Sequence, residues 1–214
     1  MKSFTDEKSA TEFIEKKLEA KYGEKFTVMS IEYDTTYPQA DVVTAHAYPL
    51  SDPEKSVYVY ARSTGLIEDT YSEYLFKDEA EAFGKGLLSD KAYILSCEVK
   101  LKTPTQSKTW EKEEGFMEYI SQDGLGAPML DFTVTLHEGL EINEYAEQVF
   151  DILQTLYEPG INAELWADAS GENIFLDNHA GSPPPNPYSL ERIEKIIEDS
   201  IDENQRMQDS LEAN

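Results

Sequence analysis

Carboxylates are the side chains in this sequence best suited to chemistry, and several stand in adjacent pairs. Glu68–Asp69 and Glu113–Glu114 are two examples. Two carboxylates that share a cleft can divide general acid and general base roles between them. The chain of 214 residues contains 43 Asp and Glu residues, however, so adjacent pairs are expected by chance. The pairs therefore identify no active site.

Histidine motifs give no metal site either. The segment 137–141 begins like the helix motif of zinc proteases, but glutamate stands where the second histidine is needed. The segment 168–173 is rich in oxygen ligands, yet its spacing departs from that of an EF-hand calcium loop and favours a hairpin turn. The histidines are scattered singly along the chain: His46, His137 and His179. We expect them to be surface or hydrogen-bonded residues rather than ligands.

The chain has one cysteine, Cys97, which excludes an internal disulfide and a cysteine-based zinc cluster. Cys97 stands within a strand pattern, which favours a packed thiol over a nucleophile. The sequence also lacks a serine elbow of the G-x-S-x-G type and a glycine-rich phosphate loop. We therefore expect no catalytic residue, no metal and no cofactor, and hence a non-enzymatic protein.

The net charge of −25 is the strongest compositional signal. A chain this acidic repels phosphate backbones and anionic lipid headgroups, so nucleic acid and membrane surfaces are not expected partners. The charge is uneven, because no Lys or Arg occurs between Lys112 and Arg192, a stretch that carries 16 carboxylates. Two interpretations stay open: solubility alone, or an acidic surface that attracts a basic protein partner. Cation binding is a third.

The carboxylates of this acidic stretch gather on one predicted helix. Apolar residues from Ile142 to Tyr157 follow helical spacing, and acidic residues three or four positions apart occupy the opposite face. The candidate partner-binding residues are Glu138, Glu141, Glu144, Glu147 and Asp151.

A second candidate surface is aromatic. Tyr58 and Tyr60 alternate with Val57 and Val59, so the two tyrosines share one face of a predicted strand. They form either core beneath a helix or a binding face with amphipathic anchors. Core is favoured here, because the two valines must also be covered on the other side.

The periodicities predict an α+β protein with mostly antiparallel sheet and helices packed on one face. Predicted helices are 11–22, 77–88, 112–121, 142–157 and 189 to about 206. Predicted strands are 26–33, 42–48, 57–62, 66–69, 93–101, 129–137, 163–166 and 173–176.

The predicted elements fall into a helix-plus-meander unit at 1–89, an acidic α+β unit at 90–181, and a Pro-rich connector with a C-terminal helix at 182–214. A single domain is the alternative. The hairpins at 61–69 and 167–175 resemble each other, through either duplication of an α+β unit or shared turn chemistry.

The segments 13–28 and 65–71 carry a resemblance. A helix that ends in Lys-Tyr-Gly-Glu leads into a strand, and a Gly-Leu-Ile-Glu-Asp-Thr-Tyr turn follows. This is similar to a loosely defined group of small membrane-anchored or lipoprotein-type proteins of low-GC Gram-positive bacteria, over about the first 90 residues. Some members of that group sit beside secreted toxins as immunity proteins. The resemblance implies an extracytoplasmic protein and carries over no catalytic residue.

No apolar leader stands at the start of the sequence, so we expect either a cytoplasmic protein or an extracytoplasmic one whose leader or anchor has been removed. The predicted function is that of a binding protein, an immunity-type inhibitor that docks a basic toxin through its acidic surface. The alternative is a cell-envelope accessory or small-ligand-binding domain that uses the tyrosine face.

Overall fold

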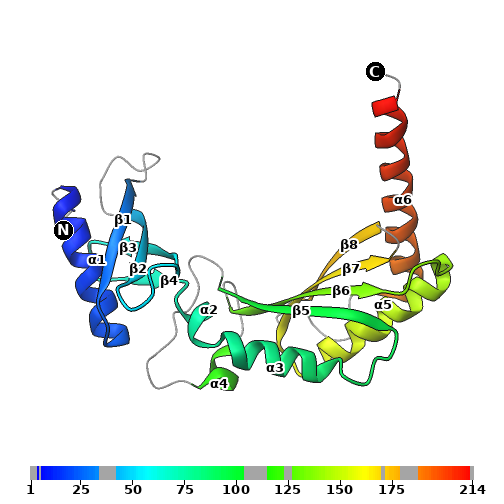
Figure 1. Cartoon of the computed structure of the whole chain (residues 1–214), viewed down its shortest axis with the longest axis horizontal. Helices are drawn as coiled ribbons and strands as arrows, with labels where there is room; N and C mark the ends of the chain where they lie inside the picture. The colour runs from blue at the N-terminus through cyan, green and yellow to red at the C-terminus, as the bar shows by residue number, and fades with distance from the viewer. Residues whose placement is uncertain are drawn as a thin grey trace. The chain divides into compact units, whose positions relative to one another are not determined.

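The computed structural model describes Phe4 and residues 6–33, 42–103, 115–122, 127–169, 172–178 and 188–212. The fold is α+β, as predicted, with two four-stranded sheets (Figure 1). Its elements are α1 (Glu7–Tyr22), β1 (Phe26–Tyr33), β2 (Val42–Pro49), β3 (Val57–Arg62), β4 (Ile67–Asp69), α2 (Ser72–Leu75), α3 (Lys77–Leu87), β5 (Ile94–Lys102), α4 (Phe116–Ile120), β6 (Met129–Leu136), α5 (Ile142–Tyr157), β7 (Asn162–Ala169), β8 (Glu172–Asn178) and α6 (Leu190–Glu212).

The chain divides into two compact units. Unit 1 comprises residues 1–76, 102–119 and 125–128, and unit 2 comprises residues 77–101, 120–124 and 129–214. The chain therefore passes between the units several times. This division differs from the contiguous ranges expected from the sequence, because local patterns carry no information about which distant segments pack together.

In unit 1, α1 packs on one face of the antiparallel sheet β1-β2-β3-β4, called sheet 1 below. Residues Ala10, Ile14 and Leu18 of the helix are fully buried. The helix begins earlier than predicted because Asp6 and Ser9 form a capping box, in which the Asp6 carboxylate accepts from Ser9 N at 2.7 Å. It ends at Gly23, as predicted, in the left-handed conformation (φ 76°) that glycine adopts most easily.

In unit 2, the sheet β5-β6-β7-β8, called sheet 2 below, is mixed. β6 and β7 are parallel, whereas β7 and β8 form an antiparallel hairpin. The parallel pair is an exception within the mostly antiparallel sheet that the sequence predicts. Its physical reason is α5, which returns the chain to the starting edge of the sheet so that β7 runs in the same direction as β6.

The inner face of sheet 2 is the face covered by α3 and α5, which lie on the same side of the sheet (Figure 1). The inward residues of β6 have no exposed surface, as their alternation predicts: Leu130, Phe132, Val134 and Leu136. The apolar stripe of α5 is buried as well: Tyr145, Val149, Ile152, Leu153 and Leu156.

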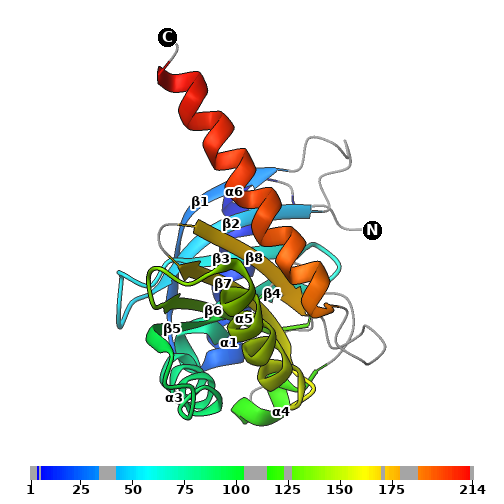
Figure 2. The same cartoon turned by 90° about the vertical axis from the view of Figure 1, so that its right-hand side faces the viewer.

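Helix α6 packs against α5 and β8 and then continues beyond the sheet (Figure 2). Its N-cap is Ser189, as predicted, whose Oγ accepts from Arg192 N at 3.2 Å. The helix extends to Glu212 rather than ending near Arg206. The predicted connector at 182–187 lies outside the described residues. Among the helices in the described ranges, none is long and apolar enough to cross a membrane.

Candidate binding surfaces

The outer face of sheet 2, which points away from α3 and α5, is a candidate binding surface. Leu165 and Ala167 of β7 are buried on the inner face, so the alternating residues Glu164, Trp166 and Asp168 point outward. Ser96 Oγ of β5 donates a hydrogen bond to Thr135 Oγ1 of β6 at 2.9 Å on this same face. The outward side chains of the four strands therefore form a row that is partly exposed to solvent.

An aromatic pair lies within this face. Trp166 and Phe175 stand opposite each other in the β7–β8 hairpin, with ring centroids 4.5 Å apart and planes inclined by 42°. Trp166 is 40% exposed and Phe175 is 43% exposed. A cross-strand aromatic pair contributes about 0.2–1 kcal/mol to a sheet. The exposure leaves part of both rings available to a ligand.

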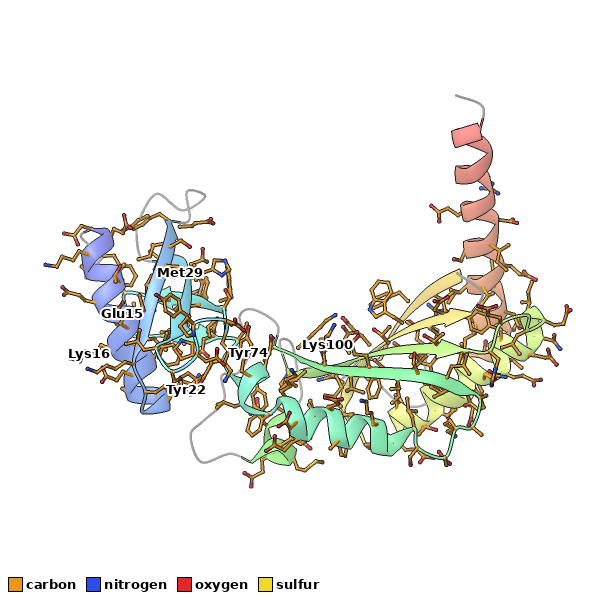
Figure 3. All side chains as sticks on the ribbon, in the orientation of Figure 1. Glu15, Lys16, Tyr22, Met29, Tyr74 and Lys100 are labelled. Atoms are coloured by element: carbon orange, nitrogen blue, oxygen red, sulfur yellow. The ribbon has the colours of Figure 1, made fainter. Side chains whose placement is uncertain are left out.

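Carboxylates flank the aromatic pair. Glu164 and Asp168 stand two residues on either side of Trp166, which places their Cα atoms about 7 Å from it along the strand. Asp131 of β6 stands opposite Glu164. Basic side chains of this face belong to β5. Lys100, which is labelled in Figure 3, pairs with Glu98 at 3.0 Å. Strands β6 to β8 therefore place carboxylate side chains beside the aromatic rings.

The predicted carboxylates of α5 occupy the opposite side of unit 2, on the solvent-facing side of the helix. Glu138 and Glu147 are exposed. Glu141 and Glu144 are exposed too, but they form a capping box in which Glu141 N donates to a Glu144 carboxylate oxygen at 3.2 Å. These two residues therefore cap the N-terminus of α5 and also contribute negative charge.

Asp151, the fifth predicted carboxylate of this group, is engaged within unit 2. Its Oδ2 lies 2.9 Å from Lys91 Nζ and accepts a 2.6 Å hydrogen bond from Tyr93 Oη. Burial opposes ionisation of Asp151, but the hydrogen bonds from Tyr93 and Lys91 outweigh it and lower the pKa of the carboxyl. Burial, together with the bond to Asp151, raises the pKa of the Tyr93 hydroxyl. Asp151 thus joins α5 to the residues before β5, a role that the sequence prediction missed.

The tyrosine face of sheet 1 is half-buried and does not form core. Val57 and Val59 have no exposed surface and face α1, whereas Tyr58 and Tyr60 are half-buried on the outer face. The favoured prediction of a tyrosine core is therefore wrong, because α1 packs on the valine side of the sheet.

The two tyrosines already have partners within unit 1. Tyr58 makes an edge contact with His46 at 5.5 Å between ring centroids. The Tyr60 hydroxyl accepts from Arg62 Nη2 at 2.9 Å and Nε at 3.1 Å.

The remaining sequence candidates are the histidines, the cysteine and the hairpin at 168–173. No group of three or more His, Cys, Asp or Glu side chains that could hold a metal occurs there. His46 and His137 are exposed, and His179 lies outside the described ranges. Cys97 is half-buried, and burial raises the pKa of its thiol despite the nearby Lys85. The hairpin expected at 168–173 is confirmed by the β7–β8 pairing.

The sequence analysis missed the pair of Trp166 and Phe175. Part of the signal was present, because the predicted hairpin turn at 169–171 brings Trp166 close to Phe175. A three-residue turn there would pair Trp166 with Ile174, whereas the observed register pairs Trp166 with Phe175. Whether the two rings are exposed to solvent depends on which face of sheet 2 the helices cover. That is decided by the positions of α3 and α5, which the sequence alone does not give.

A scan against protein-family models matches no family, and a search of curated proteins gives no match. Among solved structures, the chain is similar to a DUF5037 family protein from Ruminococcus gnavus. The identity is 12% and the TM-score 0.41, over 88% of this chain and 99% of that one.

Proposed function

We propose that this protein is a non-enzymatic binding protein that attracts a basic protein partner through the negative potential of unit 2. The observation that carries the proposal is the set of exposed carboxylates on and before α5, including Glu138, Glu144 and Glu147, in a stretch of sequence without Lys or Arg. The resemblance of the first segments gives the proposal its specific form, an immunity-type inhibitor of a basic toxin.

The electrostatics of the helix support this proposal. Glu144 and Glu147 lie three residues apart on α5, and like charges at neighbouring positions on a helix surface cost an isolated helix about 0.2–0.5 kcal/mol per pair. A surface that concentrates one sign of charge accelerates the approach of an oppositely charged partner, in some cases by factors of about 10–1000. Where fast association is needed, the faster approach of the partner thus outweighs the small loss of helix stability.

The test is capture of partners from the medium and lysate of the host, followed by association kinetics with the purified partner at low and high salt. The variant Glu138→Lys with Glu147→Lys reverses two exposed charges while leaving the Glu141–Glu144 capping box and Asp151 intact. We expect association about tenfold slower at low salt and nearly unchanged at 1 M salt, where the Debye length is about 3 Å.

The control is Glu12→Lys with Glu19→Lys on the exposed side of α1, which gives the same change of net charge in unit 1. If both double variants slow association equally, net charge alone is responsible and the acidic surface of unit 2 has no special role. Retention of a partner that salt does not weaken, and that Tyr58→Ala abolishes, would instead favour the tyrosine face of sheet 1.

A further inference from the structure

The outer face of sheet 2 differs from the acidic side of α5, because it combines negative charge with exposed aromatic rings. Trp166 and Phe175 keep 40% and 43% of their surfaces exposed, and their rings are in contact with each other. Tryptophan, tyrosine and arginine dominate the binding energy of protein interfaces. An exposed tryptophan beside a second ring therefore marks a contact point rather than a merely solvated surface.

The surroundings of the pair select a cation. Glu164 and Asp168 stand on either side of Trp166 along β7, and Asp131 stands opposite Glu164 on the neighbouring strand. The indole face attracts cations through its quadrupole, and the flanking carboxylates add to that attraction. A guanidinium group fits such a place better than an ammonium, since its plane stacks on an aromatic ring while its edge donates to carboxylates.

We propose that Trp166 and Phe175 receive an arginine side chain of the basic partner, with Glu164 and Asp168 supplying the opposing charge. This proposal rests on the proposed function and deepens it. It assigns long-range attraction of the partner and direct contact with the partner to two different surfaces of unit 2. The α5 carboxylates lie on the other side of unit 2, so they influence the rate of approach, whereas the outer face of sheet 2 holds the partner.

The first experiment uses the full chain and three synthetic peptides of alternating glycine and a test residue: arginine, lysine or citrulline. Citrulline keeps the planar shape of arginine and lacks its charge. Binding is followed through Trp166 fluorescence in a Trp110→Phe background, which leaves Trp166 as the remaining tryptophan. We expect the arginine peptide to bind more tightly than the lysine peptide, and the citrulline peptide to bind at least tenfold more weakly than the arginine peptide.

Variants then locate the contact, with binding measured by calorimetry. Trp166→Ala is expected to weaken the arginine peptide about tenfold without changing the slope of affinity against salt. Trp166→Phe retains a ring and should lose only about half of that effect on a logarithmic scale. Leu95→Ala is the control, because Leu95 is a 55% exposed apolar residue of the same unit. Circular dichroism confirms that each variant is folded.

Several outcomes would overturn this assignment. They are equal binding of the citrulline and arginine peptides, unchanged binding by Trp166→Ala, or no binding of the arginine peptide to the unaltered chain. Concentration-dependent association of the protein with itself, abolished by Trp166→Ala, would make the face a self-association surface instead.

The charge-reversed variant Glu138→Lys with Glu147→Lys separates the two proposals. If that variant slows capture of the basic partner while Trp166→Ala does not alter it, the proposed function stands and the arginine site is wrong. If the unaltered chain retains no basic partner at low salt, the proposed function itself fails.

Discussion

Gly84 lies in α3 where the helix meets the inner face of sheet 2, and replacing it with alanine should destabilise unit 2. A Cβ atom at this position would lie 2.6 Å from Val99 Cγ1, 2.9 Å from Val99 Cγ2 and 3.1 Å from Phe132 Cε1. Carbon atoms pack best at about 3.5–4.0 Å. Val99 and Phe132 are buried, and the branched valine has little freedom to turn away.

The magnitude follows from two opposing effects. Overpacking of a buried site costs about 1–3 kcal/mol. Alanine favours a helix over glycine by about 0.8–1.0 kcal/mol, so the net loss for Gly84→Ala is about 0–2 kcal/mol. Gly86 in the same helix has no atom within 4 Å of its would-be Cβ, so Gly86→Ala should gain up to about 1 kcal/mol. The two variants should therefore differ by about 1–3 kcal/mol.

Urea unfolding at neutral pH measures this difference. Trp166 fluorescence in a Trp110→Phe background reports unit 2, and the midpoint is compared at constant slope. Because helix propensity acts in the same direction in both variants, their difference isolates the close approach of α3 to Val99. Equal or greater stability of Gly84→Ala relative to Gly86→Ala would refute the packing argument.

Two further predictions concern carboxylates that the structure engages. Asp151→Ala should lower the free energy of unfolding by about 1 kcal/mol at pH 7, since the carboxylate is half-exposed but bound to Lys91 and Tyr93. Its folded pKa is lowered, so this contribution is present above the unfolded pKa of about 3.9 and is lost as the pH falls through the folded value. Urea unfolding from pH 7 to pH 2 should show the two proteins converging, and a gap that persists at the lowest pH would contradict it. Asp69→Ala should cost about 3–5 kcal/mol, because the fully buried carboxylate pairs with Lys21 at 2.9 Å. Thermal unfolding measures the loss, and Asp69→Ala combined with Lys21→Met should recover part of it; a single variant as stable as the unaltered chain would show that the pair contributes nothing.

Local patterns predicted the elements of this fold well, because each element buries its own periodic face. The alternation in β6 and the stripe in α5 matched the buried residues of the structure, and Gly23 ended the first helix as expected. These features depend on a few consecutive residues and need no knowledge of distant segments.

The features that the sequence did not predict depend on pairing at long range. The parallel direction of β6 and β7 follows from the path of α5. The exposure of Tyr58 and Tyr60 follows from coverage of sheet 1 by α1 on the valine side. The engagement of Asp151 follows from Lys91, 60 residues earlier in the chain. No periodicity in the sequence contains such information.

The repeated passage of the chain between the two units has a consequence for biosynthesis. Residues 1–76 of unit 1 leave the ribosome first, followed by 77–101 of unit 2, and only then by 102–119 and 125–128, which belong to unit 1. Ser72 is 1% exposed in the finished protein, and its hydroxyl is hydrogen-bonded to those of Thr103 and Tyr119. Until Thr103 and Tyr119 emerge, the Ser72 hydroxyl cannot form these two hydrogen bonds. The first helix and sheet are then an incomplete unit. A polypeptide released early, after residue 89, would therefore lack part of the interior of unit 1, and quality control could recognise it as unfinished.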